Sequence, residues 1–253
     1  MRTHVISGTA SGLGAALRRR FESAGDRVLG IDRRDAEIVA DLGTVSGRER
    51  AILEARRLSG GAIDGVVSCA GLGPYDPPDP VVRVNYFGAI ALLDGLRDEL
   101  RRGREGAAVA ISSVGAIFEE IMIPELLEAC RTGDEEAAAG LVRGRDGTTA
   151  YSNAKHALAR AVRARVAEWG GLGLRLNVVA PGKMETPMLD RLLASPEHAP
   201  AIEALPVPLG RSSSAHDIAG AVTFLLGPDA RFVHGQVLFV DGGSEALLRP
   251  DRV

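Results

Sequence analysis

The sequence has few cysteines, which limits how the fold can be stabilised. Only Cys69 and Cys130 occur among its 253 residues, too few for the disulfide frameworks of small secreted domains. Two longer features are missing as well: no basic stretch leads into an apolar leader segment, and no run of eighteen apolar residues occurs. We therefore expect a cytoplasmic protein that neither enters nor crosses a membrane.

A strong net charge is also missing, and so are the usual metal-ligand motifs. The formal net charge is −3 and the isoelectric point is near 6.0, which gives no electrostatic footprint for nucleic acid. The five histidines lack HxxxH or HExxH spacing and no CxxC pair occurs, so we expect no metal site. No serine lies in a GxSxG sequence, which argues against a nucleophile-elbow hydrolase.

The sequence does contain a regular alternation of short apolar runs and longer helical patterns. Its length and 45% hydrophobic content suffice for one large domain with a buried core. The strand-like runs are residues 4–8, 27–32, 64–71, 107–113, 174–182 and 236–243. Continuous apolar strands separated by helices are typical of a parallel sheet that is covered on both faces. We therefore predict a single-domain α/β protein, residues 1–253, with a Rossmann-type doubly wound parallel sheet.

The first of these runs leads directly into the glycine-rich sequence SGTASGLG, residues 7–14. A GxxxGxG loop between a strand and a helix leaves room for a phosphate, which the free N–H groups of the helix N-terminus can bind. An ordinary turn that caps a helix is the alternative. A helix over 15–23 and the strand 27–32 follow, and the strand ends in Asp32, 18 residues after Gly14. This is close to the spacing at which an acidic side chain binds the adenosine ribose of a dinucleotide.

A second motif, YSNAK at residues 151–155, carries groups suited to proton transfer. Tyr151 and Lys155 are four residues apart, so on a helix they share one face, and a nearby ammonium would lower the pKa of the phenol. A chance surface pair is the alternative. Upstream, Ser112 and Ser113 end a predicted strand at the edge where open α/β sheets bind ligands. A hydroxyl there could hold a substrate carbonyl.

Together these motifs resemble those of the short-chain dehydrogenase/reductase family along the whole chain. The sequence has SGTASGLG for the family's TGxxxGxG, SCAG for NNAG, VNYFG for its asparagine helix, a serine strand, YSNAK for YxxxK and APGKMET for PGxxxT. The resemblance implies a catalytic tetrad of Asn85, Ser113, Tyr151 and Lys155. Asn85 would act through a water that relays protons, or its amide could brace the sheet. Two departures are Ser7 for the family threonine and Cys69 for an asparagine that braces the central strand.

The same resemblance implies which residues contact a dinucleotide. They are Gly8, Thr9, Ser11, Gly12, Leu13, Gly14, Asp32, Asp41, Leu42, Ala70, Gly71, Tyr151, Lys155, Pro181, Gly182 and Thr186. Lys155 would bind the nicotinamide ribose, and Thr186 would lie near the cofactor amide or phosphates. We expect NAD rather than NADP, because Asp32 would accept from the ribose 2′-hydroxyl and repel a 2′-phosphate. Arg33 and Arg34 leave some use of NADP open.

A narrower resemblance is to the bacterial 3α-hydroxysteroid dehydrogenase/carbonyl reductase branch of this family. It lies in the sequences GIDRRDAEIVADL, CAGLGP, VNYFGA and VHGQVLFVDGG. It implies an NAD-dependent enzyme that interconverts a secondary or aryl alcohol and its carbonyl, with a hydroxysteroid or another bulky hydrophobic compound as substrate. A coniferyl-alcohol-type aromatic alcohol dehydrogenase is one alternative. A dinucleotide-binding protein without catalytic activity is another.

Two segments set the chain apart from a minimal family member. Residues 114–150 form an insertion before the catalytic tyrosine, in which Pro124, Gly133 and Gly144 mark the ends of two short helices. Residues 184–210 predict a helical lid with an apolar face for the substrate. Because the insertion would obstruct the helix bundle of the family's common tetramer, we expect a homodimer of C2 symmetry formed through another face.

Overall fold

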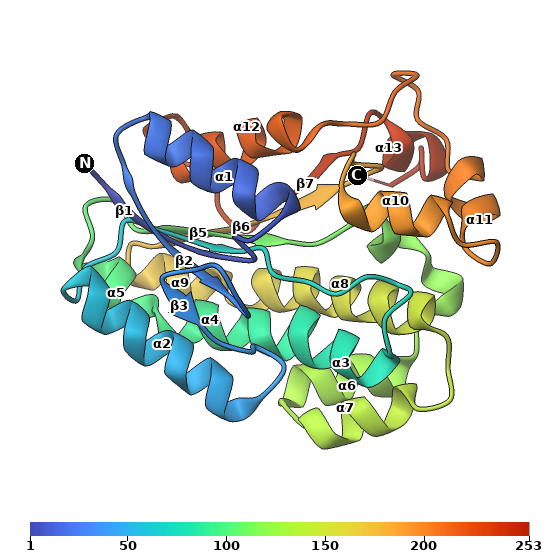
Figure 1. Ribbon diagram of the computed structural model, residues 1–253, viewed down its shortest axis with the longest axis horizontal. Helices are drawn as coiled ribbons and strands as arrows, with labels where there is room; N and C mark the ends of the chain where they lie inside the picture. The colour runs from blue at the N-terminus through green and yellow to red at the C-terminus, as the bar shows by residue number, and fades with distance from the viewer. Residues whose placement is uncertain (253) are drawn as a thin grey trace.

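The structure, a computed structural model, describes residues 1–252, and in that range seven strands form one parallel sheet (Figure 1). The strands are β1, Thr3–Ser7; β2, Arg27–Asp32; β3, Ile38–Val39; β4, Gly65–Ser68; β5, Ala107–Ile111; β6, Arg175–Pro181; and β7, Val237–Val240. Their order in the sheet is β3-β2-β1-β4-β5-β6-β7. This is the strand order of doubly wound dinucleotide-binding folds, so the predicted fold class is confirmed.

Helices cover both faces of this sheet. On the upper face in Figure 1, α1, Gly12–Ser23, packs against α12, Ala215–Leu226. The opposite layer holds α2, Val45–Ser59; α3, Pro78–Val82; the π-helical turn η1, Arg83–Gly88; α4, Ala89–Gly95; α5, Arg97–Arg102; α8, Gly147–Ala164; and α9, Val166–Gly171. Shorter elements lie at the edges: η2, Val114–Ile117; η3, Glu119–Ile121; α10, Pro187–Leu193; α11, Ala199–Ala204; η4, Pro228–Ala230; and α13, Ser244–Leu248. Within residues 1–252, no helix has the length and apolar character needed to cross a bilayer.

The core divides into two apolar layers, one on each face of the sheet. Val109 of β5 belongs to the layer under α1 and α12, whereas its neighbour Ala108 belongs to the opposite layer. The same division separates Val67 from Val66 on β4. Successive strand residues point to opposite faces, and both faces are buried here. This is why the strand sequences are continuously apolar rather than alternating.

Two local predictions were wrong. The two-residue strand β3 was missed, because Ile38 and Val39 are too short a run to stand out from the surrounding turn. Helix α1 begins at Gly12 rather than at residue 15, because the glycine loop continues directly into the first helical turn. Neither error changes the order of the other six strands.

The segment before Tyr151 contains the two expected helices, α6, Pro124–Thr132, and α7, Glu135–Val142. Gly133 ends α6 in the left-handed conformation, with φ of 79°. Both helices lie below α3 and α8 in Figure 1, on the side away from the sheet. Asn153 of α8, which the sequence did not single out, accepts a hydrogen bond from the Ile123 N–H at 2.8 Å and so holds the start of α6. The insertion is thus a third layer on one side of the domain.

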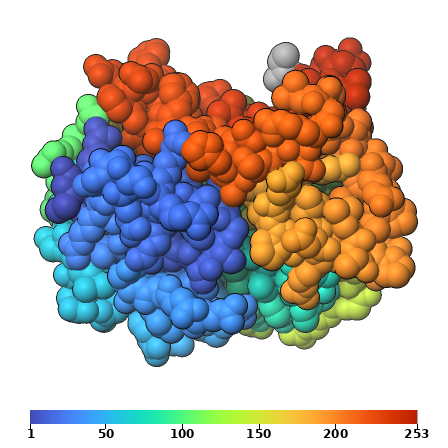
Figure 2. All heavy atoms as spheres, turned by 45° about the horizontal axis from the view of Figure 1, so that its top comes forward, coloured from blue at the N-terminus to red at the C-terminus, as the bar shows by residue number. Residues whose placement is uncertain are grey.

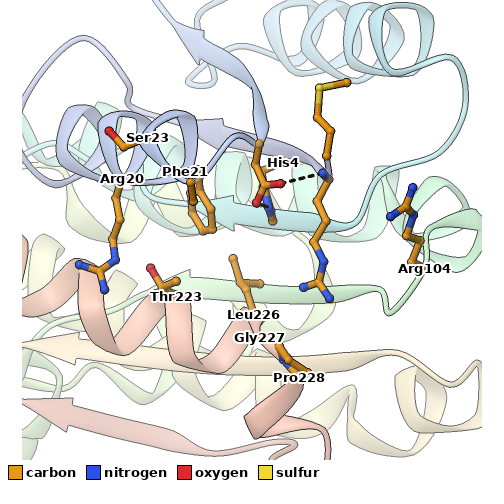
Figure 3. Close-up of a pocket in the computed structure, with 13 residues that line it drawn as sticks. His4, Arg20, Phe21, Ser23, Arg104, Thr223, Leu226, Gly227 and Pro228 are labelled. Atoms are coloured by element: carbon orange, nitrogen blue, oxygen red, sulfur yellow. Dashed lines mark hydrogen bonds and ion pairs between the residues drawn. The ribbon is translucent and has the colours of Figure 1, made fainter.

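A hollow of about 680 Å³ lies at the amino-terminal edge of the sheet, away from the glycine loop (Figure 3). In it the His4 ring stacks on Phe21 with a centroid separation of 4.1 Å, and His4 Nε2 lies 3.3 Å from an Asp26 carboxylate oxygen. Burial lowers the pKa of His4, although Asp26 opposes this. Arg20 and Arg104 lie at opposite sides of the hollow in Figure 3. His4 therefore acts as a neutral packing residue, remote from the predicted site.

Candidate active site

The carboxyl ends of the strands open into a cavity of about 880 Å³. Figure 2 shows this face of the molecule, where the N-terminal residues in blue meet the orange segment 184–210 along a groove. Ligands of doubly wound sheets bind at this edge. The predicted residues that line the cavity are Gly8, Ser11, Gly12, Leu13, Gly14, Asp32, Asp41, Leu42, Ala70, Gly71, Ser113, Tyr151, Lys155, Pro181, Gly182 and Thr186.

The glycine loop is built by a close approach of two backbone segments. Gly8 has a positive φ of 81°, and its N–H donates to the Ile31 carbonyl at 2.7 Å. A β-carbon built on Gly14 would lie only 2.0 Å from the Gly8 carbonyl oxygen, so no larger residue fits at that position. Thr186, at the start of α10, lies next to Gly12, where a β-carbon would be 3.6 Å from its methyl group. The result is a backbone cradle at the N-terminus of α1 that fits a pyrophosphate group.

Asp32 lies at the end of β2 beside this cradle. One carboxylate oxygen accepts a hydrogen bond from the Ala10 N–H at 3.0 Å, and the other accepts one from the Arg33 N–H at 2.7 Å. Asp32 lines the cavity. It follows Gly14 by 18 residues, close to the spacing at which an acidic residue binds the adenosine ribose. Thr9 differs from its predicted neighbours: its side chain is buried against Gly30 instead of lining the cavity.

Ser7, which replaces the family threonine, braces the floor of the site. Its hydroxyl accepts hydrogen bonds from the N–H groups of Cys69 and Ala70, both at 3.0 Å. The loop after β4 is therefore held to β1 by a serine hydroxyl. Burial raises the pKa of the Cys69 thiol to about 12, so this cysteine stays protonated and unreactive.

Ser113, Tyr151 and Lys155 come together at the junction of β5 and α8. The preceding residue, Ser112, explains the alignment: its hydroxyl donates to the Lys155 carbonyl at 2.9 Å and ties the helix to the strand. Lys155 is 4% exposed, and its ammonium donates to the Ile111 carbonyl at 2.8 Å. The same nitrogen lies 5.8 Å from the centre of the Tyr151 ring. The predicted trio is therefore assembled on one cavity wall, with Lys155 buried and Ser113 and Tyr151 half-buried.

The expectation that Lys155 lowers the pKa of the Tyr151 phenol was wrong. Burial raises the pKa of Tyr151, and the nearby Ser113 hydroxyl only partly opposes this. Burial also lowers the pKa of Lys155 to about 8. Both shifts have one cause, because a poorly solvated site disfavours the charged form of each group. Tyr151 is thus a neutral phenol, suited to donate a proton.

Asn85 lies behind the cavity wall rather than in it. It is fully buried, and its side-chain amide accepts from the Leu72 N–H at 2.8 Å and donates to the Leu72 carbonyl at 3.0 Å. A β-carbon on Gly71 would lie 3.1 Å from the Asn85 amide oxygen and 3.5 Å from the Lys155 ammonium. Asn85 therefore braces the loop at Gly71, and the Lys155 ammonium lies beside the same glycine.

The far end of the cavity is apolar and is covered by the segment 184–210. Its lining side chains there are Phe118, Met184, Met188, Leu189, Leu192, Ile202 and Leu205. Arg191 of α10 crosses to the opposite loop, where its guanidinium stacks on the Tyr75 ring at 3.8 Å from the centroid. Nothing in the sequence connected Tyr75 with Arg191, because only the fold brings the proline-rich loop opposite α10.

Comparisons with known proteins agree with this architecture. A family model described as Enoyl-(Acyl carrier protein) reductase matches residues 137–245. The chain is 42% identical over 250 residues to the 3-alpha-hydroxysteroid dehydrogenase/carbonyl reductase of Comamonas testosteroni, covering 97% of each chain. It is 29% identical over 268 residues to 3beta-hydroxysteroid dehydrogenase 1 of Eggerthella lenta, covering 96% of this chain and 93% of the relative.

A solved structure is similar over the whole fold. The 3-alpha-hydroxysteroid dehydrogenase of Pseudomonas sp. B-0831, complexed with NADH, matches with a TM-score of 0.97 and 44% identity, over 99% of this chain and 100% of that one. Levodione reductase matches with a TM-score of 0.75 and 27% identity, over 97% and 98% of the two chains. The resemblance that the motifs indicated is confirmed by this agreement in sequence and topology. The chain belongs to the short-chain dehydrogenase/reductase family.

Proposed function

We propose that the protein is an NAD-dependent oxidoreductase that interconverts a secondary or aryl alcohol and its carbonyl, with a hydroxysteroid or another bulky hydrophobic compound as substrate. The observation that carries this proposal is the convergence of Ser113, Tyr151 and Lys155 in a cavity that also contains the glycine cradle. The relatives support it, since one is a 3-alpha-hydroxysteroid dehydrogenase/carbonyl reductase and a similar structure holds NADH. The apolar wall from residues 184–210 suits a large apolar substrate.

The residues present fit a dinucleotide. The cradle of Gly8, Gly12 and Gly14 would hold the pyrophosphate, Asp32 the adenosine ribose and Lys155 the nicotinamide ribose. Asp41 and Leu42 line the neighbouring wall and would contact the adenine. When bound, NAD supplies the hydride acceptor of the reaction, and NADH the donor.

The protein's own part in the reaction is to bind and move a proton. Ser113 would hydrogen-bond the substrate oxygen, and Tyr151 would give that oxygen a proton in carbonyl reduction or take one in alcohol oxidation. Lys155 would hold positive charge near the phenol when the latter ionises. Asn85 would support the relay of the proton through water. Its side chain is engaged with Leu72, so it would support the relay by bracing the loop beside Lys155.

Two other functions are tested by one assay. A coniferyl-alcohol-type enzyme would reduce NAD with aromatic alcohols but not with steroids, and a dinucleotide-binding protein without activity would respond to neither. The absorbance of NADH at 340 nm, followed with panels of hydroxysteroids, aryl alcohols and aliphatic alcohols, separates the three. The presence of all four tetrad side chains favours an enzyme.

We also propose a cytoplasmic homodimer that uses a face other than the α8 surface. Helices α6 and α7 pack on α3 and α8, where the family's helix bundle would form. On the other side of the domain, large apolar side chains are exposed: Phe224 is 46%, Phe232 is 101% and Leu238 of β7 is 38% exposed. Apolar side chains around an edge strand favour association there.

The phenylalanine variant of Tyr151 tests the central proton transfer. Tyr151→Phe removes one hydroxyl and keeps the ring packing, so NAD affinity should be unchanged while kcat falls by at least about 10²-fold. Steady-state kinetics and fluorescence titration with NADH measure the two effects. Turnover within a few-fold of wild type would contradict the proposed role.

The raised pKa of Tyr151 predicts different pH dependences for the two directions. Oxidation needs the phenolate, so kcat/KM for the alcohol should rise from about pH 7 to about pH 10, whereas reduction needs the neutral phenol and should stay level over that range and decline only above about pH 10. Initial rates in both directions at matched ionic strength provide the test. An oxidation rate that is flat across this range would show that the phenolate already predominates near neutrality.

Cofactor preference tests Asp32. Wild-type kcat/KM should be higher with NAD than with NADP, and Asp32→Asn, which removes the charge but keeps the shape, should raise the relative efficiency with NADP by about tenfold. Asp41→Asn is the matched control, because Asp41 lines the same cavity. Equal or better efficiency of the wild type with NADP would overturn the assignment of NAD.

Light scattering on the purified protein tests the assembly. A mass of two chains is expected, and Phe232→Ser should weaken the dimer if the exposed apolar face forms it. A tetramer, or a dimer insensitive to that change but disrupted by substitutions on α8, would contradict the proposed arrangement.

A further inference from the structure

The insertion contacts the site through the turn that carries Asn85. Helix α7 packs on η1 as well as on α3, and Figure 1 shows α6 and α7 beneath this part of the domain. The turn η1 is π-helical, a rare widening of the helix that is often found at functional sites. Arg83 opens the turn and Tyr86 directly follows Asn85. Both of these neighbours are bonded to the insertion.

The first link is a carboxylate that joins three elements. Glu135 of α7 accepts two hydrogen bonds from the Arg48 guanidinium of α2, at 2.6 and 2.9 Å, and one from Arg83 at 3.1 Å. The side chains of Arg48 and Glu135 are only 8% and 17% exposed, so this is a nearly buried, charge-assisted pair. Glu136 and Asp79 pair with the same Arg83 guanidinium. The start of η1 is thereby fixed from several directions.

The second link is a buried hydroxyl. Tyr86 donates a hydrogen bond to the Cys130 carbonyl of α6 at 2.7 Å, and the two residues are 4% and 2% exposed. Burial raises the pKa of Tyr86 to about 12, so the hydroxyl remains a donor at neutral pH. Because neighbouring residues of a helical turn rotate together, fixing the Tyr86 side chain also fixes the direction in which Asn85 points.

Asn85 in turn depends on that direction. Its amide must reach both backbone groups of Leu72, and its amide oxygen and the Lys155 ammonium both lie beside Gly71 of the same loop, close to where a β-carbon on that glycine would stand. A rotation of η1 would break the pair with Leu72 and shift the loop that lies beside the Lys155 ammonium. The geometry of the proton path is therefore sensitive to how η1 is anchored.

We propose that Glu135 and Tyr86 are positioning residues for catalysis, through which the insertion α6–α7 holds Asn85 in its working orientation. This inference rests on the proposed role of Asn85 in the proton relay. It gives the insertion a part in the reaction in addition to covering α3 and α8. A purely structural role is the competing explanation, and it would affect unfolding rather than turnover.

The test compares small changes on the two links with a matched change elsewhere on the insertion. Tyr86→Phe removes only the hydroxyl, and Glu135→Gln removes the charge with little change in shape. Glu128→Gln is the control, because Glu128 of α6 pairs only with the nearby exposed Arg131 among the described residues. For each we measure kcat, the KM values for NAD and alcohol, the solvent isotope effect on kcat and the melting temperature.

We expect Tyr86→Phe and Glu135→Gln to lower kcat by about tenfold through misplacement of Asn85, with KM values within about twofold of wild type and an altered solvent isotope effect. Glu128→Gln should match wild type. In a double-mutant cycle, adding Tyr86→Phe to the Asn85→Ala variant should lower kcat little further, because Tyr86 acts on catalysis through Asn85.

The outcomes separate this inference from the proposed function. Wild-type kcat in both Tyr86→Phe and Glu135→Gln, or equal losses of kcat from Tyr86→Phe with and without Asn85→Ala, would overturn the inference alone, provided Asn85→Ala is itself impaired. A fully active Asn85→Ala variant would overturn the relay role and the inference with it. The proposed oxidoreductase activity would still stand on Tyr151→Phe.

Discussion

The structure depends on one geometric constraint: parallel strands buried on both faces end at a common edge. Each strand delivers its last residue to the same side of the molecule, and the helices that connect the strands must begin there. Ser7, Asp32 and Ser113 lie at or just beyond the ends of three different strands. They meet although they are far apart in the chain. Local motifs carry the binding cradle and the reactive groups, and the sheet brings them together at one edge.

Burial then sets the chemistry of these groups. The same poorly solvated pocket raises the pKa of Tyr151 and lowers that of Lys155 to about 8, because each loses the hydration of its charged form. The two shifts move the pKa values of the proton donor and the cation apart, so that the neutral phenol outlasts the ammonium as the pH rises. The lysine is held by the Ile111 carbonyl, and Ser112 fixes the helix that carries both residues. Backbone carbonyls and a hydroxyl therefore determine the alignment of the reactive pair.

The insertion shows how a peripheral element can become part of such a site. It adds a layer that contacts α3, η1 and α8, and two of its polar contacts reach Arg83 and Tyr86, on either side of Asn85. Two buried anchors, Glu135 and the Cys130 carbonyl, come from different helices of the insertion. The sides of α3 and α8 that face away from the sheet are covered here by helices of the same chain. The π-helical turn η1 is therefore held in place by contacts with α6 and α7 of the same chain.

The sequence alone determined the fold class, the glycine cradle, Asp32 and the Ser-Tyr-Lys set. The fold class follows from apolar runs that form the buried strands, and the other features follow from residue spacing within short motifs. It also indicated the two insertion helices through their proline and glycine boundaries. Only the tertiary structure decided the direction of the Tyr151 pKa shift, since desolvation depends on what surrounds a side chain. The same is true of the buried position of the Thr9 side chain and of the contacts of Arg191, because each depends on packing between segments distant in sequence, and no local pattern records those distances.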